Sequence, residues 1–117
     1  MRFQINDNII NYSAQVLAHT EDGMTWAQIA KFFRKKSSEY HVAAPFVNTL
    51  FPSNLANRRD GFIRNLRAFS PEQQFILLNE LCDLTNKKVN STPLKKMLLH
   101  HRTKSRFTFA EINHNSL

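Results

Sequence analysis

Apolar residues recur at helical spacing through most of the chain, beginning near its N-terminus. Ile9, Ile10, Val16 and Leu17 fall on one stripe of a helix. This spacing predicts a first helix over residues 7–19, which the Glu-Asp-Gly sequence that follows would end.

A second helix is predicted to begin after Thr25. Thr25 and Gln28 have the spacing of a capping box, in which a hydroxyl and a side-chain amide each satisfy a backbone N–H at the helix start. The helix would end near Ser38 or continue to Tyr40. Its apolar face would consist of Trp26, Ile29, Phe32 and Phe33.

Residues 41–56 show no regular period. Pro45 and Pro52 interrupt them, with apolar residues between the two prolines. We expect a loop that packs onto the core, with a short extended segment as the alternative. The side chains expected to pack are Phe46, Val47, Leu50 and Phe51.

The third predicted helix covers residues 57–68 and turns Phe62, Ile63 and Leu66 inward. Gly61 in its interior costs about 1 kcal/mol relative to alanine. The glycine therefore predicts either a close contact between helices or a later start of this helix.

The fourth predicted helix has the clearest start. Ser70, Pro71 and Gln73 combine an N-cap residue, a proline at the first helical position and the amide of a capping box. Apolar residues then cover most of the circumference, so we expect this helix to be central and the most buried. They are Phe75, Ile76, Leu77, Leu78, Leu81, Cys82 and Leu84.

A fifth helix is predicted to begin at Thr92 and Pro93, and the five elements together define the expected fold. The fold class is all-α, a compact orthogonal bundle of about five helices around the fourth. We expect residues 1–102 to form a single helical domain and residues 103–117 to form a basic and polar tail, disordered or bound to a partner. The expected core is Ile9, Val16, Trp26, Ile29, Phe33, Phe62, Ile63, Leu66, Phe75, Leu78 and Leu81.

Charge is unevenly distributed along the chain. Residues 1–30 hold one cation and three acids, a net charge of −2, whereas residues 31–117 hold fifteen cations and six acids, a net charge of +9. This balance predicts an acidic partner, either nucleic acid or an acidic protein face, unless the cations are only solvated helix surface. The candidate nucleic-acid contacts are Lys35, Lys36, Arg58, Arg59, Arg64 and Arg67.

Residues 23–33, GMTWAQIAKFF, are similar to the first helix of a helix-turn-helix motif. The motif needs a recognition helix after a turn of three or four residues, yet the next predicted helix begins about 20 residues later. Arg64 also has an ordinary ion-pair partner in Asp60, four residues earlier. A helix-turn-helix-like DNA-binding regulator therefore remains the alternative interpretation.

The sequence contains no recognisable catalytic or metal-binding arrangement. The single cysteine, Cys82, lies in an apolar run and is expected to be buried. His100 and His101 are adjacent, so on a helix they would point about 100° apart and could not easily share a metal ion. We expect a cytoplasmic protein that is not an enzyme, with no catalytic residue, no cofactor, no metal, no small-molecule substrate and no membrane-spanning segment.

The order of the segments resembles the AbiJ-type N-terminal helical domain of bacterial abortive-infection proteins. The segments are GMTWAQIAKFF, the proline-interrupted loop, NRRDGFIRNLRAFSPEQQFILLNELCDL and LKKMLLHHR, and the resemblance as a whole covers roughly residues 10–102. The strongest pieces are residues 57–60 and 65–84. The resemblance implies an accessory domain of an anti-phage defence protein that serves assembly, regulation or sensing, and it carries over no catalytic residue.

The chain differs from that family in one respect, because it stops at Leu117 without an effector domain. The expectation is therefore an excised fragment or a separate small subunit. Its expected function is that of a non-enzymatic protein-interaction and regulatory module that binds a protein partner or itself. A small inhibitor that masks an enzyme is a further alternative.

Overall fold

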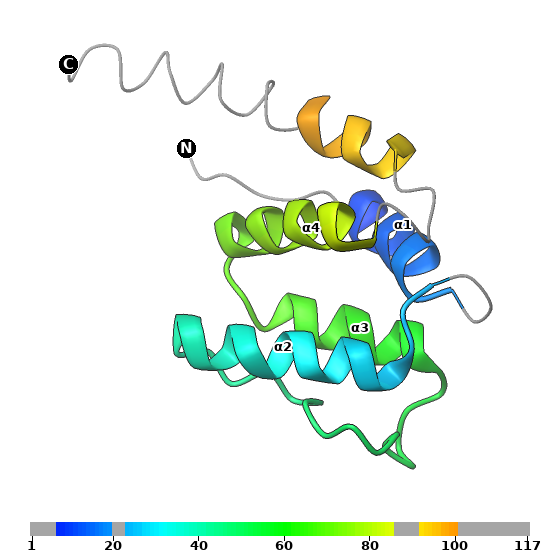
Figure 1. The fold of residues 1–117 in the computed structure, drawn as a ribbon, viewed down its shortest axis with the longest axis vertical. Coiled ribbons are helices and arrows are strands. Elements are labelled where there is room, and N and C mark those ends of the chain that lie inside the picture. The colour runs from blue at the N-terminus through cyan, green and yellow to red at the C-terminus, as the bar shows by residue number, and fades with distance from the viewer. Residues whose placement is uncertain (1–6, 20–22, 86–91, 101–117) are drawn as a thin grey trace.

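The computed structural model describes residues 7–19, 23–85 and 92–100. These residues form five helices and no strand, which confirms the expected all-α bundle (Figure 1). The helices are α1 (Asp7–Leu17), α2 (Trp26–Tyr40), α3 (Arg58–Arg67), α4 (Pro71–Thr85) and a helical segment over 92–100. None of the described helices is both long and apolar enough to cross a membrane.

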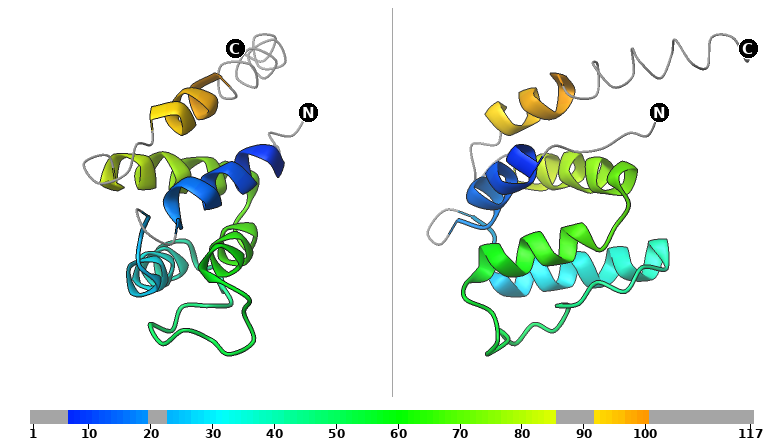
Figure 2. Two further views of the ribbon diagram at one scale, coloured as in Figure 1. Left: turned by 90° about the vertical axis from the view of Figure 1, so that its right-hand side faces the viewer. Right: turned by 180° about the vertical axis from the view of Figure 1, so that it is seen from behind.

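The helices are arranged in tiers. Helices α2 and α3 lie side by side in one tier, α1 and α4 form the next, and the segment 92–100 lies on the far side of that second tier (Figures 1 and 2). Helix α3 contacts both α1 and α2, and α1 also contacts α4. Because α2 and α3 run in the same direction, residues 41–57 must return the chain along the outside of this pair (Figure 2).

Side-chain caps fix the starts of three helices. The amide N–H of Gln28 donates to Thr25 Oγ1 at 3.2 Å, and the amide of Thr25 donates to Gln28 Oε1 at 2.9 Å. Ser70 and Gln73 make the same reciprocal pair at 3.3 and 3.0 Å before α4. Asn57 caps α3 by accepting a backbone N–H of its first turn. Both capping boxes are therefore confirmed.

The core follows the expected helical faces. Eight of the eleven expected core residues are buried, and the other three, Val16, Ile63 and Phe75, are partly buried against the same cluster. The core also includes buried residues outside this expected set of eleven. These are Ile10, Ala14, Leu17, Ala18, Met24, Ala30, Phe32, Leu55, Phe69, Leu77, Cys82, Leu94 and Leu98.

Gly61 marks a close approach between α3 and α2, as one of the two expectations for it required. A Cβ atom at this position would lie 2.6 Å from Cζ3 of Trp26 and 2.8 Å from Cδ1 of Leu55. Both distances are far below ordinary carbon contacts, so glycine lets the Trp26 ring approach the backbone of α3 this closely.

Two sequence expectations are wrong. Helix α4 is not buried around most of its circumference, because Ile76 and Leu84 are 49% and 67% exposed. Leu50 does not pack onto the core, since 76% of it is exposed in the 41–57 loop. The first helix ends at Leu17, two residues before the approximate end expected for it, where the chain turns toward α2. The expected tail, 103–117, lies outside the described residues.

Candidate functional site

Lys36, one of the six candidate nucleic-acid contacts, is used inside the fold. It is only 6% exposed, and its Nζ lies 3.1 Å from Glu39 Oε2, 2.8 Å from Glu80 Oε1 and 5.6 Å from the centre of the Phe32 ring. Burial lowers the pKa of Lys36, but the hydrogen bonds and charges of Glu80 and Glu39 outweigh this and raise the pKa above its ordinary value of 10.5. Lys36 therefore links α2 to α4.

Arg58 is also engaged by the protein itself. Its Nη1 donates to the carbonyl oxygen of Met24 at 2.8 Å and to that of His19 at 3.4 Å. These carbonyl groups lie in the connection between α1 and α2, so the guanidinium of α3 fastens that connection to the bundle.

Arg64 and Arg67 form ion pairs at the surface of α3. Arg64 Nε donates to Asp60 Oδ1 at 3.0 Å, and Arg67 Nη2 donates to Asp7 Oδ1 at 3.4 Å. The two arginine side chains are 60% and 51% exposed, so each pair contributes at most about 1 kcal/mol to stability. The expected pairing of Asp60 with Arg64 is confirmed.

Lys35 and Arg59 are exposed. The six candidates therefore do not form one cationic patch, because two are held by the fold, two are ion-paired and two lie in solvent on different helices. Lys31 and Arg34, which were not among the candidates, are exposed on α2 beside Lys35.

The 41–57 loop is fastened to α2 and α3 by side chains that bind its backbone. The Asn65 side chain accepts from the amide of Phe46 and donates to the carbonyl oxygen of the same residue, both at 2.8 Å. Nε1 of Trp26 donates to the carbonyl oxygen of Asn48 at 2.9 Å. Because these bonds come from different helices, the loop is tied to both α2 and α3.

Further bonds hold the part of the loop that lies along α2. Arg34 donates to the carbonyl oxygen of Val47 from Nε and Nη2, each at 3.3 Å, and Ser37 Oγ accepts from the amide of Ala44 at 3.3 Å. The loop therefore runs antiparallel to α2, from Ser37 toward Trp26, with its backbone satisfied at several points.

Two large apolar side chains protrude where this loop turns away from α2. Leu50 is 76% exposed and Phe51 is 46% exposed. Phe51 rests edge-on against Trp26, with ring centroids 5.3 Å apart and planes at 83°. The amide of Leu50 donates to Asn48 Oδ1 at 2.9 Å, which fixes the turn between them. We call Leu50 and Phe51 the loop tip.

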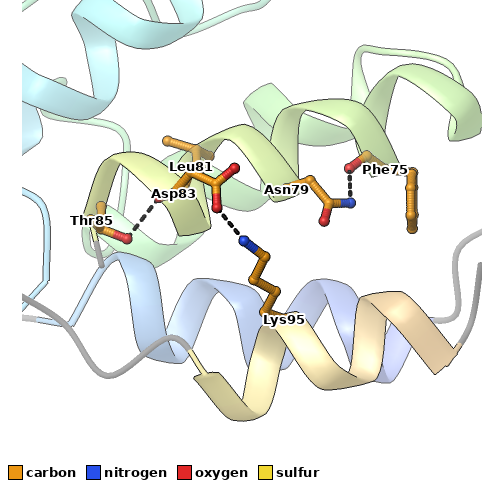
Figure 3. A network of polar contacts seen from close by, with 6 residues as sticks. All are labelled: Phe75, Asn79, Leu81, Asp83, Thr85 and Lys95. Carbon is orange, nitrogen blue, oxygen red and sulfur yellow. Dashed lines mark hydrogen bonds and ion pairs between the residues drawn. The ribbon is translucent and has the colours of Figure 1, made fainter. Parts of the chain in front are cut away.

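The acids in the described residues are placed for ion pairing. Five of the six take part in salt bridges, and Glu72 is the sixth. Lys95 of the segment 92–100 pairs with Asp83 of α4 (Figure 3). Within 7–19, 23–85 and 92–100 there is no group of three His, Cys, Asp or Glu residues that could hold a metal ion. Cys82 is buried, as expected.

The helix connections bear on the DNA-binding alternative. Residues 41–57 separate α2 from α3, so the turn that a helix-turn-helix needs does not follow α2. A three-residue connection, 68–70, does join α3 to α4. In that position α4 would be the recognition helix, yet its charged residues are Glu72, Glu80 and Asp83, all of the sign that DNA repels.

Sequence reasoning missed the residues that hold the loop. Asn65 is fully buried on the apolar side of α3, between Phe62 and Leu66, and a polar residue at such a position needs a specific partner. That signal was present in the sequence. The identity of its partner, Phe46, nineteen residues earlier, was not.

In comparisons with known proteins, no family model, curated protein or solved structure matches this chain. The class that its geometry defines is an all-α helical bundle with a side-chain-anchored loop between its second and third helices.

Proposed function

We propose that this chain is a non-enzymatic protein-interaction and regulatory module that works in the cytoplasm. The observation that carries the proposal is the loop tip, in which two adjacent apolar side chains are held in solvent by a loop whose own backbone is anchored. Exposed apolar residues that are adjacent and held in place are typical of protein-binding surfaces.

The placement of charged groups supports a binding role over a catalytic one. Five of the six described acids are engaged by cations, and general acid–base chemistry needs paired groups whose environments drive their pKa values apart. The described residues offer no such pair in a common site.

A direct test is the composition of the native complex. The tagged full chain, purified from its native cells at physiological ionic strength, should elute above its own mass of 13.7 kDa with a second protein or a second copy present in fixed ratio. A strictly monomeric chain that recovers no protein would argue against the proposal.

We propose further, from the resemblance of the segment order to AbiJ-type domains, that this module serves an anti-phage abortive-infection system. Deletion of the gene should then raise the plating efficiency of some phages on the native host, and point substitutions at the binding surface should reproduce the deletion. Genes for an effector beside this one would support the assignment, whereas unchanged susceptibility to every phage tested would remove it.

Nucleic-acid binding is the second candidate function, and the exposed cations of α2 are what favour it. Its affinity for duplex DNA should fall steeply with salt, since each neutralised phosphate releases counterions. Substitution of Lys35 and Arg59 by alanine should weaken that affinity. Binding that ignores both salt and these substitutions would eliminate this candidate.

A further inference from the structure

The loop tip is presented in a fixed conformation before any partner arrives. Bonds from Trp26, Arg34 and Asn65 hold the backbone of residues 46–48, and Asn48 in turn holds the amide of Leu50. A pre-organised loop loses little conformational entropy on binding, which favours affinity per contact. The exposure of the tip is therefore built into the fold.

The exposed face of α2 carries three cations, and the one acid of this helix, Glu39, is paired with Lys36. Lys31, Arg34 and Lys35 are spaced at three and four residues along α2, so they share one exposed side of that helix. Arg34 touches the loop through the carbonyl oxygen of Val47, three residues before Leu50. Arg34 thus connects the cationic side of α2 to the loop that carries the tip.

This cationic side is not neutralised within the part of the chain that the structure describes. Lys36, Arg64, Arg67 and Lys95 are the cations that pair with its acids, whereas Lys31 and Lys35 pair with none of them. Lys31 and Lys35 are therefore available to an acidic surface on another molecule.

A second copy of this chain is a poor source of such a surface. Five of the six described acids already have partners, and of the three acids of α4 only Glu72 is without a salt bridge. The full chain also has a net charge of +7, so two copies repel each other at low salt. The occupant is therefore a different and acidic molecule.

The chemistry of the loop tip decides between protein and nucleic acid. Phosphate groups would satisfy the cations of α2, and a base could stack on Phe51. Neither offers an apolar cavity for Leu50, the most exposed large apolar side chain in the described residues. A protein pocket would bury both side chains, and with them about 25 cal/mol for each Å² of apolar surface removed from water.

We propose that the loop tip, Leu50 and Phe51, inserts into an apolar pocket on an acidic protein while Lys31, Arg34 and Lys35 bind the acidic rim of that pocket. This rests on the proposed function and names its surface and the chemistry of its partner. Leu50 and Phe51 supply the affinity, and the cations supply the rate and orientation of encounter.

The experiment begins with a photoreactive residue in the full chain in its native cells. Phe51→p-benzoylphenylalanine should crosslink an acidic protein, whereas Leu84→p-benzoylphenylalanine should not. Leu84 is the matched control because it is 67% exposed in another tier of the bundle. The crosslinked protein is then identified, produced in pure form and titrated with the unmodified full chain.

Two substitution pairs then divide the apolar contribution from the electrostatic one. Leu50→Ser should weaken binding by about 10-fold or more, and Leu84→Ser by less than about 2-fold. The double substitution Lys31→Glu and Lys35→Glu should slow association at low salt, with the effect shrinking as salt is added, whereas Lys96→Glu should leave the rate unchanged. Circular dichroism and urea unfolding verify that every variant is folded.

Each other outcome overturns this inference. A partner that crosslinks at Leu84 and tolerates Leu50→Ser would leave the proposed function standing with a different surface. If neither Phe51 nor Leu84 gives a crosslink while a protein still co-purifies, the proposed function would likewise stand with a different surface. A short duplex DNA that binds through Lys31 and Lys35, with no protein recovered, would overturn the proposed function as well.

Discussion

Single residues with unusual surroundings determine how the α2–α3 tier is assembled. Gly61 allows the Trp26 ring to reach the backbone of α3, and Trp26 then has one side free to bind the loop through Asn48 and Phe51. Because Gly61 has no side chain, Trp26 lies where it can hold the loop that presents the loop tip.

Gly61→Ala should destabilise the protein although alanine is the better helix former. The gain in helix propensity is about 1 kcal/mol, and overpacking against an anchored tryptophan costs about 1–3 kcal/mol, so we expect a net loss of up to about 2 kcal/mol. Urea unfolding measures it. Arg67→Ala, at an exposed site of the same helix, should change the unfolding free energy by less than about 0.5 kcal/mol. An alanine at position 61 that stabilises the protein would refute the close contact.

Lys36→Met should lower the unfolding free energy by about 1–2 kcal/mol at neutral pH, because Glu39 and Glu80 lose their shared partner. The loss stays below that of a fully buried pair, since the two glutamates are 43% and 38% exposed. The pKa of Lys36 is raised in the folded state, so its contribution is complete below pH 10.5 and disappears as the pH rises through the raised value.

The measurement is urea unfolding of wild type and Lys36→Met at neutral pH and above pH 10.5. The difference between the two proteins should shrink at the higher pH. Lys35→Met is the control, because Lys35 is exposed. A difference that grows with pH would contradict the claim that the ion pairs of charged Lys36 stabilise the folded state.

At the scale of elements, the 41–57 loop behaves as part of the folded layer. It lies against the outer side of α2 and α3, and its contacts come from helices on both sides of it in sequence (Figure 2). The 41–57 loop therefore contributes to the stability of the fold in addition to connecting α2 to α3.

Asn65→Ala should therefore be costly. It leaves the amide and carbonyl of Phe46 without their partner in a buried setting, which costs about 2–4 kcal/mol in unfolding free energy for two lost bonds. Asn79→Ala is the matched control, because Asn79 binds only the carbonyl oxygen of Phe75 within its own helix at 3.0 Å (Figure 3). Equal losses for the two variants would mean that the loop is not held by Asn65.

The helical segment 92–100 belongs to the same core, although residues 86–91 before it lie outside the described structure. Leu98 is fully buried and its neighbour Leu99 is 62% exposed. Leu98→Ala should cost about 2–4 kcal/mol, while Leu99→Ala should change the unfolding free energy by less than about 0.5 kcal/mol. Urea unfolding of the two variants separates a packed fifth helix from one that is only attached, for which both losses would be small.

For the whole molecule, local sequence patterns were sufficient to predict where the helices lie. Which of their side chains are buried depends on tertiary contacts between helices. The capping boxes at Thr25 and Ser70 involve residues three apart, so the sequence was sufficient to locate two helix starts. Lys36 pairs with Glu80, forty-four residues later, and no local pattern distinguishes such a buried lysine from the exposed Lys35 beside it.

The same reason explains the errors about apolar residues. Leu50 and Leu84 are of a residue type that is common in cores. Whether each is buried depends on whether another element of the bundle packs over it. Helical spacing identifies a face of a helix and not the presence of something to pack against it. The sequence therefore identified the apolar residues of the candidate site but could not predict that they would be exposed at the surface.

The molecule also separates its charges by tier. Residues 23–70, which contain α2, the loop and α3, hold eight cations and two acids, whereas α1 and α4 hold four acids and no cation. The acidic partner that we propose would therefore be attracted to the side of the bundle that carries the loop tip.

The central claim is that this side binds protein, and the mass of the native complex after nuclease treatment tests it most directly. The tagged full chain is purified from native cells, with and without nuclease digestion, and its mass is measured by light scattering. We expect a protein complex heavier than 13.7 kDa that is unchanged by nuclease. Collapse to a 13.7 kDa monomer on digestion would contradict the claim and assign the cationic side to nucleic acid.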